Sequence, residues 1–260
     1  MSLPKGYINT EALATIAKLL NNIKQRSYDV MNIQIGNKVL DVGCGPGTDT
    51  ITLGTIVRKH GLVIGADYDL TMLATANSRA EQGGLSAWVK HLQADAASLP
   101  FATDFFDSSR SERLFQHLPF PQQALSEMVR VTKPGGWIVV LDPDWGSLSI
   151  DTTEIDIERR LASFVANTAV HNGFSGRSLY RLFKQQQLND IGFEVFPVTV
   201  TRSAFFRESI QADRTEQDAV AAGIFSDEDI CIWRNSQAQA DADGVYFASV
   251  NLILMAGRKP

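Results

Sequence analysis

The sequence is poor in the features that mark secreted, membrane and nucleic-acid-binding proteins. It has two cysteines in 260 residues, Cys44 and Cys231, which excludes a disulfide framework. No apolar run approaches the roughly 18 residues of a membrane span, and residues 1–7 lack the apolar core of a signal peptide, so we expect a cytoplasmic protein without a membrane span. The 24 basic and 29 acidic residues give a net charge of -5 without a Lys/Arg cluster, so nucleic acid is not expected as a partner.

A metal site is not expected either. The four histidines His60, His91, His117 and His171 are scattered and have no close carboxylate or thiolate companions in the sequence. No base is evident near Cys44, and we interpret this residue as a small apolar side chain rather than a nucleophile. The chemistry of the chain must therefore reside in another feature of the sequence.

Glycine is concentrated directly after one apolar run. Residues 39–42 predict a buried parallel strand, and Gly43, Gly45 and Gly47 follow it at alternate positions. Glycine permits positive φ and lets a ligand approach the main chain with no Cβ in the way. Asp41 would repel a pyrophosphate and suits a positively charged ligand. The Gly-x-Gly-x-Gly spacing also differs from the Gly-x-Gly-x-x-Gly of dinucleotide loops, although a turn with incidental glycines remains an alternative.

At these residues the chain resembles the class I S-adenosylmethionine-dependent methyltransferases, whose first motif is an acidic residue followed by this glycine pattern. The next apolar run ends in Asp67, whose carboxylate can accept two hydrogen bonds from a ribose diol, as the acid of nicotinamide enzymes also does. The resemblance assigns Asp95 to the adenine amino group and the backbone N–H of Ala96 to a ring nitrogen, and it places the backbone of Ser111 beside the methionine part. The implied S-adenosyl-L-methionine site comprises Asp41, Gly43, Cys44, Gly45, Gly47, Asp67, Tyr68, Asp95, Ala96 and Ser111.

The resemblance implies a fold of the α/β class. Its core would be a seven-stranded, doubly wound, Rossmann-like sheet, mostly parallel with an antiparallel last strand, with helical cap insertions. We expect a single domain over residues 1–260, made of an N-terminal helical region (1–35), a cofactor-binding core (36–145), and cap helices with closing strands (146–260). Within the last region, residues 150–168 and 213–240 predict helical segments, and residues 245–257 predict the closing strand.

The fourth predicted strand departs from the family pattern. Ser108, Ser109 and Arg110 stand where apolar strand residues are usual. Polar residues at these positions predict a strand that is not fully buried. Water would then reach the centre of the cleft in which the resemblance places the cofactor.

The resemblance is closest to members that act on small molecules, including the ubiquinone/menaquinone-biosynthesis C-methyltransferases of the methyltransferase type 11 group. We therefore expect direct in-line transfer of the sulfonium methyl to a small-molecule acceptor, for which the protein must align the reactants and exclude water. His117 is the candidate general base where the acceptor must lose a proton, although a packing role also fits this residue. Asp144 and Trp145 follow the fifth predicted strand at the ligand-binding edge of the sheet and are candidate acceptor-binding residues.

Two other functions remain open from the sequence. The chain could bind S-adenosylmethionine without transferring its methyl group, because the binding residues and the transfer residues are largely separate. It could also be a nicotinamide-dependent oxidoreductase, which the glycine spacing and Asp41 disfavour. The sequence identifies neither the acceptor, nor the atom that is methylated, nor the oligomeric state.

Overall fold

The computed structural model describes residue 16 and residues 18–260, so the start of the predicted N-terminal helical region lies outside the described residues. Within the described part, seven strands form one sheet in the order β3-β2-β1-β4-β5-β7-β6. The strands are β1 (Lys38–Val42), β2 (Leu62–Asp67), β3 (Val89–Gln93), β4 (Phe106–Glu112), β5 (Thr132–Ile150), β6 (Asn189–Val200) and β7 (Ala248–Arg258).

The strand directions match the expected doubly wound sheet. Adjacent strands among β1 to β5 are parallel, whereas β7 is antiparallel to both β5 and β6. This confirms a mostly parallel sheet with an antiparallel last strand. Because β1 lies between β2 and β4, the loops that follow these strands meet at one edge of the sheet, where open α/β sheets bind their ligands.

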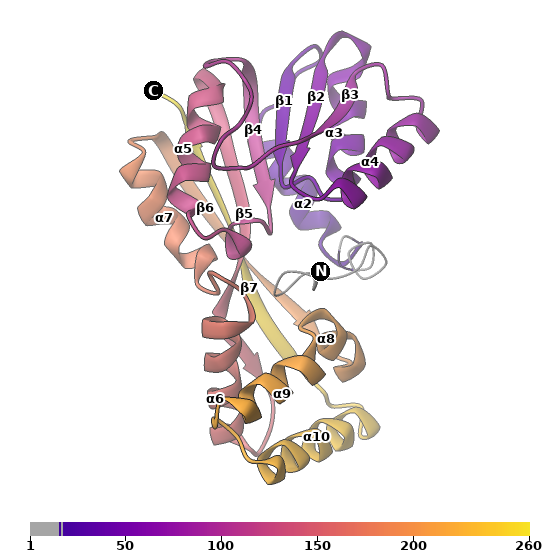
Figure 1. Cartoon of the computed structure of the whole chain (residues 1–260), viewed down its shortest axis with the longest axis vertical. Coiled ribbons are helices and arrows are strands. Elements are labelled where there is room, and N and C mark those ends of the chain that lie inside the picture. The colour runs from indigo at the N-terminus through magenta and orange to yellow at the C-terminus, as the bar shows by residue number, and fades with distance from the viewer. Residues whose placement is uncertain (1–15, 17) are drawn as a thin grey trace.

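Helices cover both faces of the sheet (Figure 1). Alternate strand residues point to opposite faces, so Val39 packs in one apolar core with residues of α2 and α3, and Leu40 packs in another with residues of α5 and α7. The helical elements are α2 (Asn21–Val30), α3 (Thr48–Val57), η1 (Arg58–His60), α4 (Leu70–Gln82), η2 (Phe115–His117), α5 (Pro121–Val131), α6 (Ile155–Phe164), η3 (Val165–Ala169), α7 (Ser175–Gln185), α8 (Ser203–Ser209), α9 (Ala212–Ala221) and α10 (Asp227–Ala242).

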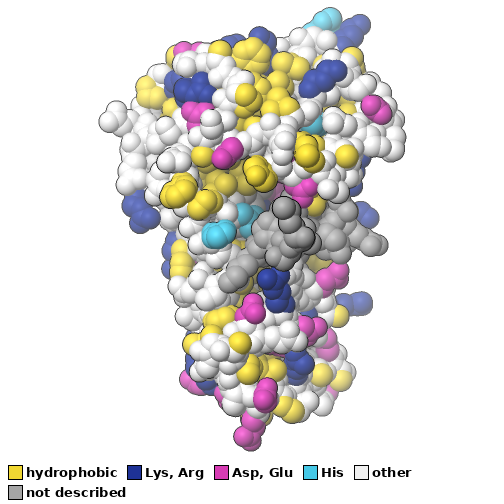
Figure 2. Space-filling view, in the orientation of Figure 1, with side chains coloured by type: hydrophobic (Ala, Val, Ile, Leu, Met, Phe, Trp, Pro, Cys, Tyr) yellow, Lys and Arg dark blue, Asp and Glu magenta, His cyan; other side chains and the backbone are white. Residues whose placement is uncertain are grey.

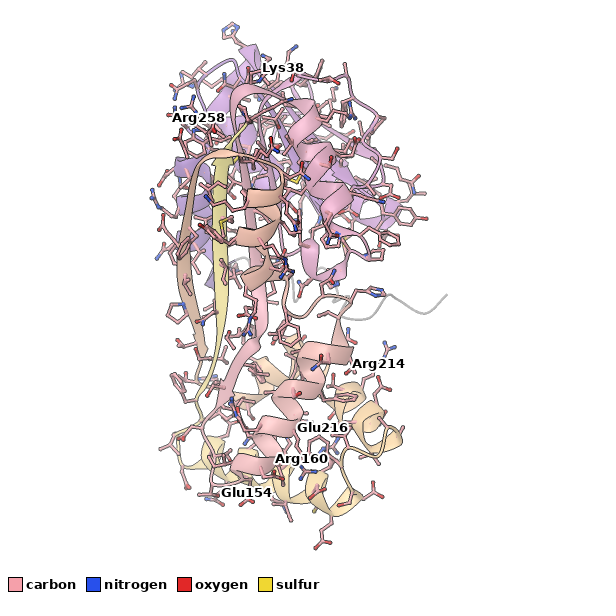
Figure 3. The ribbon with its side chains drawn as sticks, turned by 90° about the vertical axis from the view of Figure 1, so that its left-hand side faces the viewer. Lys38, Glu154, Arg160, Arg214, Glu216 and Arg258 are labelled. Atoms are coloured by element: carbon pink, nitrogen blue, oxygen red, sulfur yellow. The ribbon has the colours of Figure 1, made fainter. Side chains whose placement is uncertain are left out.

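β5 is much longer than the apolar run that it contains, which covers only residues 137–141. It pairs with β7 from Trp137 opposite Arg258 to Ile150 opposite Ala248, with a break in register between Asp144 and Ser149. The two strands thereby extend past the part of the sheet formed by β1 to β4 and carry a cap of α6, α8, α9 and α10 at the far end of an elongated molecule (Figures 1 and 3). The cap has an apolar core of its own, which includes Leu148, Ile157, Leu161, Phe206, Phe225 and Trp233.

The cap corrects the predicted boundaries of its elements. The predicted helical segment 150–168 begins only at Ile155, because Ile150 still pairs in β5. The predicted segment 213–240 is two helices: Gly223 has a φ of +70° just after α9, and Ser226 caps α10. The helix α8 was not predicted, and the closing strand begins at 248 rather than 245.

The prediction of a partly exposed fourth strand is wrong, because β4 is buried. It lies between β1 and β5, and Ser109 and Arg110 are fully buried. The hydroxyl of Ser109 accepts a hydrogen bond from Thr132 Oγ1 at 2.8 Å, and the hydroxyl of Ser108 donates to the carbonyl of Trp137 at 2.9 Å. Arg110 is ion-paired, as described below. The strand tolerates polar residues because protein groups bind most of their polar atoms, although Arg110 Nε and Ser111 Oγ are buried without a hydrogen-bond partner in the described structure.

The surface carries charges of both signs. On the face shown in Figure 2, Lys and Arg side chains are interspersed with Asp and Glu rather than gathered in one patch. No helix in the described part of the chain has the length and apolar character needed to cross a lipid bilayer. Among the same residues, no group of three or more His, Cys, Asp or Glu side chains is placed to hold a metal ion.

Candidate functional site

A cavity of about 1030 Å³ lies between the carboxyl edge of the sheet and the cap. It extends from the glycine loop after β1, past the ends of β2, β3 and β4, to α8 and α9 of the cap. Single drug-sized ligands occupy pockets of roughly 300–1,000 Å³. The cavity can therefore hold two small ligands side by side.

The three glycines of the loop have different surroundings, although all have positive φ. A Cβ on Gly43 would lie 2.9 Å from Cδ2 of Leu114, and one on Gly47 would lie 2.8 Å from Cβ of Ala76. A Cβ on Gly45 would meet no protein atom within 4 Å, and Gly45 lines the cavity. Gly45 therefore leaves space for a ligand, whereas Gly43 and Gly47 leave space for protein side chains.

Asp67 orients the glycine loop from the tip of β2. Its Oδ2 accepts a hydrogen bond from the backbone N–H of Gly45 at 2.7 Å, and its Oδ1 accepts one from the N–H of Asp69 at 2.9 Å. Burial raises the pKa of this carboxyl above its usual value, while the backbone N–H groups of Asp69 and Gly45 oppose the rise. Asp67 lines the cavity beside Tyr68, whose ring is largely exposed.

The residues predicted to contact adenine lie at the same edge. Asp95 is exposed, and its Oδ1 accepts a hydrogen bond from the backbone N–H of Ala97 at 2.8 Å. Asp95 and its neighbour Ala96 both line the cavity, as does Cys44 of the glycine loop. Burial raises the pKa of the Cys44 thiol well above its usual value, which keeps it protonated and suits an apolar wall.

Asp41 and Arg110 form a buried ion pair beneath the glycine loop. Asp41 Oδ1 lies 3.2 Å from Arg110 Nη1, and the two residues are 2% and 1% exposed. Burial raises the pKa of Asp41 to about 7, with Arg110 opposing the rise. The other carboxylate oxygen, Oδ2, is buried without a hydrogen-bond partner in the described structure, and Asp41 lines the cavity.

Further charges surround this pair. Arg110 lies 3.4 Å from Asp49 and 3.1 Å from Glu112, and Lys24 of α2 lies 2.8 Å and 2.7 Å from the same two carboxylates. The hydroxyl of Tyr28 donates to Asp49. Burial opposes ionisation of Asp49, but Arg110 and Lys24 outweigh it and lower its pKa. The charge cluster, defined as Lys24, Asp41, Asp49, Arg110 and Glu112, thus joins α2, α3, β1 and β4.

Sequence reasoning missed most of the charge cluster. The three polar residues in β4 were the available signal, because a charged side chain in a central strand requires partners. Those partners come from segments that are distant in the sequence, so the pattern alone could not name them.

Gly47, Ser111 and Asp144 are predicted site residues that do not line the cavity. Ser111 is fully buried, with its backbone paired between Val42 of β1 and Val140 of β5. Asp144 is 5% exposed and forms an ion pair of 2.8 Å with Arg177.

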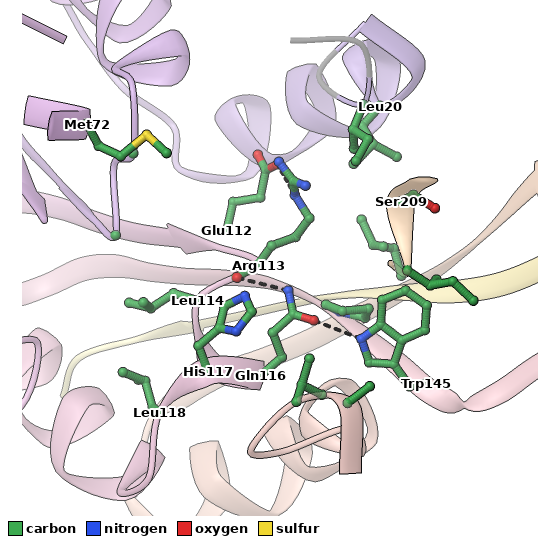
Figure 4. Close-up of a pocket in the computed structure, with 18 of the residues that line it drawn as sticks. Leu20, Met72, Glu112, Arg113, Leu114, Gln116, His117, Leu118, Trp145 and Ser209 are labelled. Atoms are coloured by element: carbon green, nitrogen blue, oxygen red, sulfur yellow. Dashed lines mark hydrogen bonds and ion pairs between the residues drawn. The ribbon is translucent and has the colours of Figure 1, made fainter. Parts of the chain in front are cut away.

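The short helix η2 carries Gln116 and His117 at the middle of the cavity, and Trp145 faces it from β5 (Figure 4). Asp142 holds this turn: its carboxylate accepts hydrogen bonds from the backbone N–H groups of Phe115 at 3.0 Å and Gln116 at 2.9 Å. Burial raises the pKa of Asp142 to about 7 against these hydrogen bonds. The predicted residues His117 and Trp145 are thus brought together from separate elements.

The cap half of the cavity is mostly apolar. Two charged cap residues line it, Arg214 and Asp218, and they pair with each other at 3.9 Å. The apolar lining on this side comes from Phe164, Val165, Val198, Val200, Phe205, Phe206, Ile210, Val250 and Leu252. A ligand in this half would meet side chains that bury apolar surface.

Comparison with known proteins gives consistent matches. A methyltransferase domain family matches residues 40–140. A 37.1 kDa protein in transposon TN4556 of Streptomyces fradiae is 36% identical over 259 residues, which cover 97% of this chain and 70% of that protein. The ubiquinone/menaquinone biosynthesis C-methyltransferase of Vibrio vulnificus is 30% identical over 181 residues, 66% of this chain and 69% of that enzyme.

A solved structure shares the fold. The geranyl diphosphate C-methyltransferase of Streptomyces coelicolor superposes with a TM-score of 0.61 at 14% identity, over 96% of this chain and 84% of that one. At this identity the likeness concerns the fold alone.

Proposed function

The chain belongs to the class I S-adenosylmethionine-dependent methyltransferases, and on that basis we propose that it methylates a small, largely apolar acceptor by direct in-line transfer. When bound, S-adenosyl-L-methionine supplies a methyl group that the positive sulfonium makes electrophilic. The observation that carries the proposal is one continuous cavity with the glycine loop at one end and apolar cap residues at the other. We propose that residues 1–260 act as a single methyltransferase unit.

Several features of the chain suit the cofactor. The unpartnered Oδ2 of Asp41 can accept from a cationic amino group, and the open backbone at Gly45 admits close contact. Asp67 keeps lone pairs for a ribose diol after accepting its two backbone N–H groups. We propose that Asp95 and the N–H of Ala96 contact the edge of the adenine base, and that Tyr68 lies at the rim of this part of the cavity.

The acceptor would occupy the cap half. Its apolar lining favours a molecule with a largely apolar body, because burying apolar surface stabilises binding by roughly 25 cal/mol per Å². The mutual pairing of Arg214 and Asp218 leaves little uncompensated charge for a strongly anionic acceptor. The net charge of -5 likewise disfavours nucleic acid.

His117 and Trp145 would act where the two halves of the cavity meet. We propose that His117 takes a proton from the acceptor when the attacking atom carries one. Trp145 would contact the acceptor through its ring. The cap would exclude water from the reacting atoms.

The experiment measures cofactor binding and methyl transfer separately. Calorimetry should detect S-adenosylmethionine binding to the full chain, and methyl-labelled cofactor should label prenylated or polycyclic acceptors in preference to compact amines and amino acids. Binding without transfer to any acceptor would contradict the transferase proposal. Preferential labelling of compact charged acceptors would contradict the apolar acceptor.

A further inference from the structure

Gln116 is held at four points next to the cavity. Its backbone N–H donates to Asp142 Oδ1 at 2.9 Å, and its carbonyl accepts from the N–H of Asn172 at 2.8 Å. Its side-chain Nε2 donates to the carbonyl of Arg113 at 3.0 Å, and its Oε1 accepts from Trp145 Nε1 at 2.8 Å (Figure 4). Only one amide orientation satisfies both side-chain bonds, because a carbonyl must accept and an indole N–H must donate.

Arg113 contributes a backbone conformation that few residues adopt. It has a φ of +51° at the end of β4, in the left-handed region, and its N–H donates to the carbonyl of Leu141 at 2.8 Å. Non-glycine residues in this region cost about 1–3 kcal/mol and persist where the surroundings hold them. The Gln116 amide is one of the groups that hold the Arg113 carbonyl in place.

Trp145 lies where β5 leaves its register with β7, between Asp144 and Ser149. Its backbone N–H donates to the carbonyl of Gly173 at 2.7 Å, so the main chain is anchored there as well. Because the indole N–H is used by Gln116, the ring offers the cavity its carbon faces and edges rather than a hydrogen-bond donor. A bond at one edge of a flat ring also restricts rotation of that ring.

We propose that Gln116 is a positioning residue that holds the Trp145 ring as a flat platform for a planar, π-bearing part of the acceptor. This inference rests on the proposed function, in which the acceptor occupies the cap half of the cavity. The turn that carries Gln116 also carries His117, so the same anchor sets the platform and the proposed base relative to each other. A flat aromatic group gains binding energy by stacking that a saturated ring of the same size does not gain.

The test uses two probes with one carbon skeleton, naphthol and decahydronaphthol. Their affinities are measured by calorimetry in the presence of S-adenosylhomocysteine, so that no turnover is needed. We expect the wild-type chain to prefer naphthol by about 2- to 12-fold, the ratio that aromatic stacking supports. Gln116→Leu should abolish this preference. Gln116→Glu loses the donor to the Arg113 carbonyl but keeps an acceptor for the indole N–H, so it should retain part of the preference.

Two further variants separate positioning from general structure. Gln93→Leu removes another glutamine that lines the cavity, at the cofactor end, where its Nε2 donates to the carbonyl of Tyr68 at 3.0 Å. It should leave the preference for naphthol unchanged. The double variant Gln116→Leu/Trp145→Phe should lose no more of the preference for naphthol than the worse single variant. Both substitutions remove the same hydrogen bond, between Trp145 Nε1 and Gln116 Oε1.

Clear outcomes would overturn the platform. The platform is contradicted if the wild-type chain shows no preference for naphthol. It is also contradicted if Gln116→Leu keeps the preference because the variant loses affinity for both probes equally or for neither. Methylation assays with naphthol distinguish this failure from failure of the proposed function. If the chain prefers naphthol through Gln116 but methylates no acceptor, the platform stands and the transferase proposal falls.

Discussion

Asp41 and Arg110 face each other directly across the β1–β4 pair, with Asp41 Oδ1 3.2 Å from Arg110 Nη1 in the interior of the sheet. Arg110 contacts Oδ1 of the carboxylate, whereas Oδ2 is buried beside the glycine loop without a hydrogen-bond partner in the described structure. Asp41 is therefore held in place by the protein and keeps an acceptor for a cationic ligand.

The raised pKa of Asp41 predicts that cofactor affinity depends on pH. Burial raises this pKa to about 7, and only the ionised carboxylate attracts the cationic amino group. Affinity for S-adenosylmethionine should therefore increase as pH rises from about 6 to about 8 and then level off. Calorimetry across this range measures the effect. Asp41→Asn should bind weakly with little pH dependence, and an equal slope in this variant would contradict the assignment.

Lys24 should contribute strongly to stability. Its ammonium group is 2.8 Å from Asp49 and 2.7 Å from Glu112, and the residue is 5% exposed. Lys24→Met leaves two buried carboxylates undercompensated, which should lower the free energy of unfolding by about 3–5 kcal/mol. Urea denaturation measures the loss.

Arg26 supplies a matched control on the same helix. It pairs with Glu194 on the surface, where solvent screens the interaction, so Arg26→Met should change the urea midpoint little. Equal midpoints for the two variants would show that the charge cluster does not stabilise the fold.

Two glycines of the loop should respond differently to alanine. Both have positive φ, so both substitutions carry backbone strain of about 1–2 kcal/mol. Gly47→Ala adds a Cβ 2.8 Å from Ala76 Cβ and should lower the melting temperature more than Gly45→Ala, whose Cβ meets no protein atom within 4 Å. Gly45→Ala should instead weaken S-adenosylmethionine binding about tenfold or more, since its methyl occupies ligand space. Unchanged cofactor affinity in Gly45→Ala would remove this loop from the site.

The raised pKa of Asp142 predicts that the folded state becomes less stable as pH rises. Burial raises its folded-state pKa to about 7, whereas the unfolded chain should titrate near the ordinary value of about 4. Between these values the folded state binds more protons than the unfolded state, so the free energy of unfolding decreases with rising pH and levels off above about 7. Asp41 has a raised pKa and contributes in the same direction.

Substitution isolates the contribution of Asp142. Asp142→Asn should be less stable in absolute terms, because it loses an acceptor for the N–H groups of Phe115 and Gln116. Its unfolding free energy should nevertheless depend less on pH between about 4 and about 7 than that of the wild-type chain. Thermal melts at several pH values compare the slopes, and an unchanged slope would contradict the prediction.

The first two strands, β1 and β2, and the glycine loop were predictable because their signals are local. An apolar run followed by glycines specifies a strand and a tight turn, whatever packs against them. The far end of β5 was not predictable, since Pro143 and Gly146 are typical of turns. Pairing with β7 determines this segment, because tertiary context outweighs local strand propensity.

The cap helices were predictable in outline only. Gly223 and the Ser226-x-x-Asp229 capping box are local signals that separate α9 from α10, and the structure uses both. α8 is a short helix of seven residues, and its position depends on packing of Phe206 into the cap core. Helices of this length gain their stability from tertiary contacts rather than from their own sequence.

The sequence by itself determined the strand–loop–helix motif, the acids at three strand ends and hence the family, since these depend on neighbouring residues and main-chain conformation. Only the tertiary structure decided which charges Arg110 meets and which group orients Trp145. The contacts of Arg110 with Asp41 and of Trp145 with Gln116 join residues 69 and 29 positions apart in the sequence. Ion pairs and hydrogen bonds require distances of a few ångströms, which only the folded sheet and its loops provide.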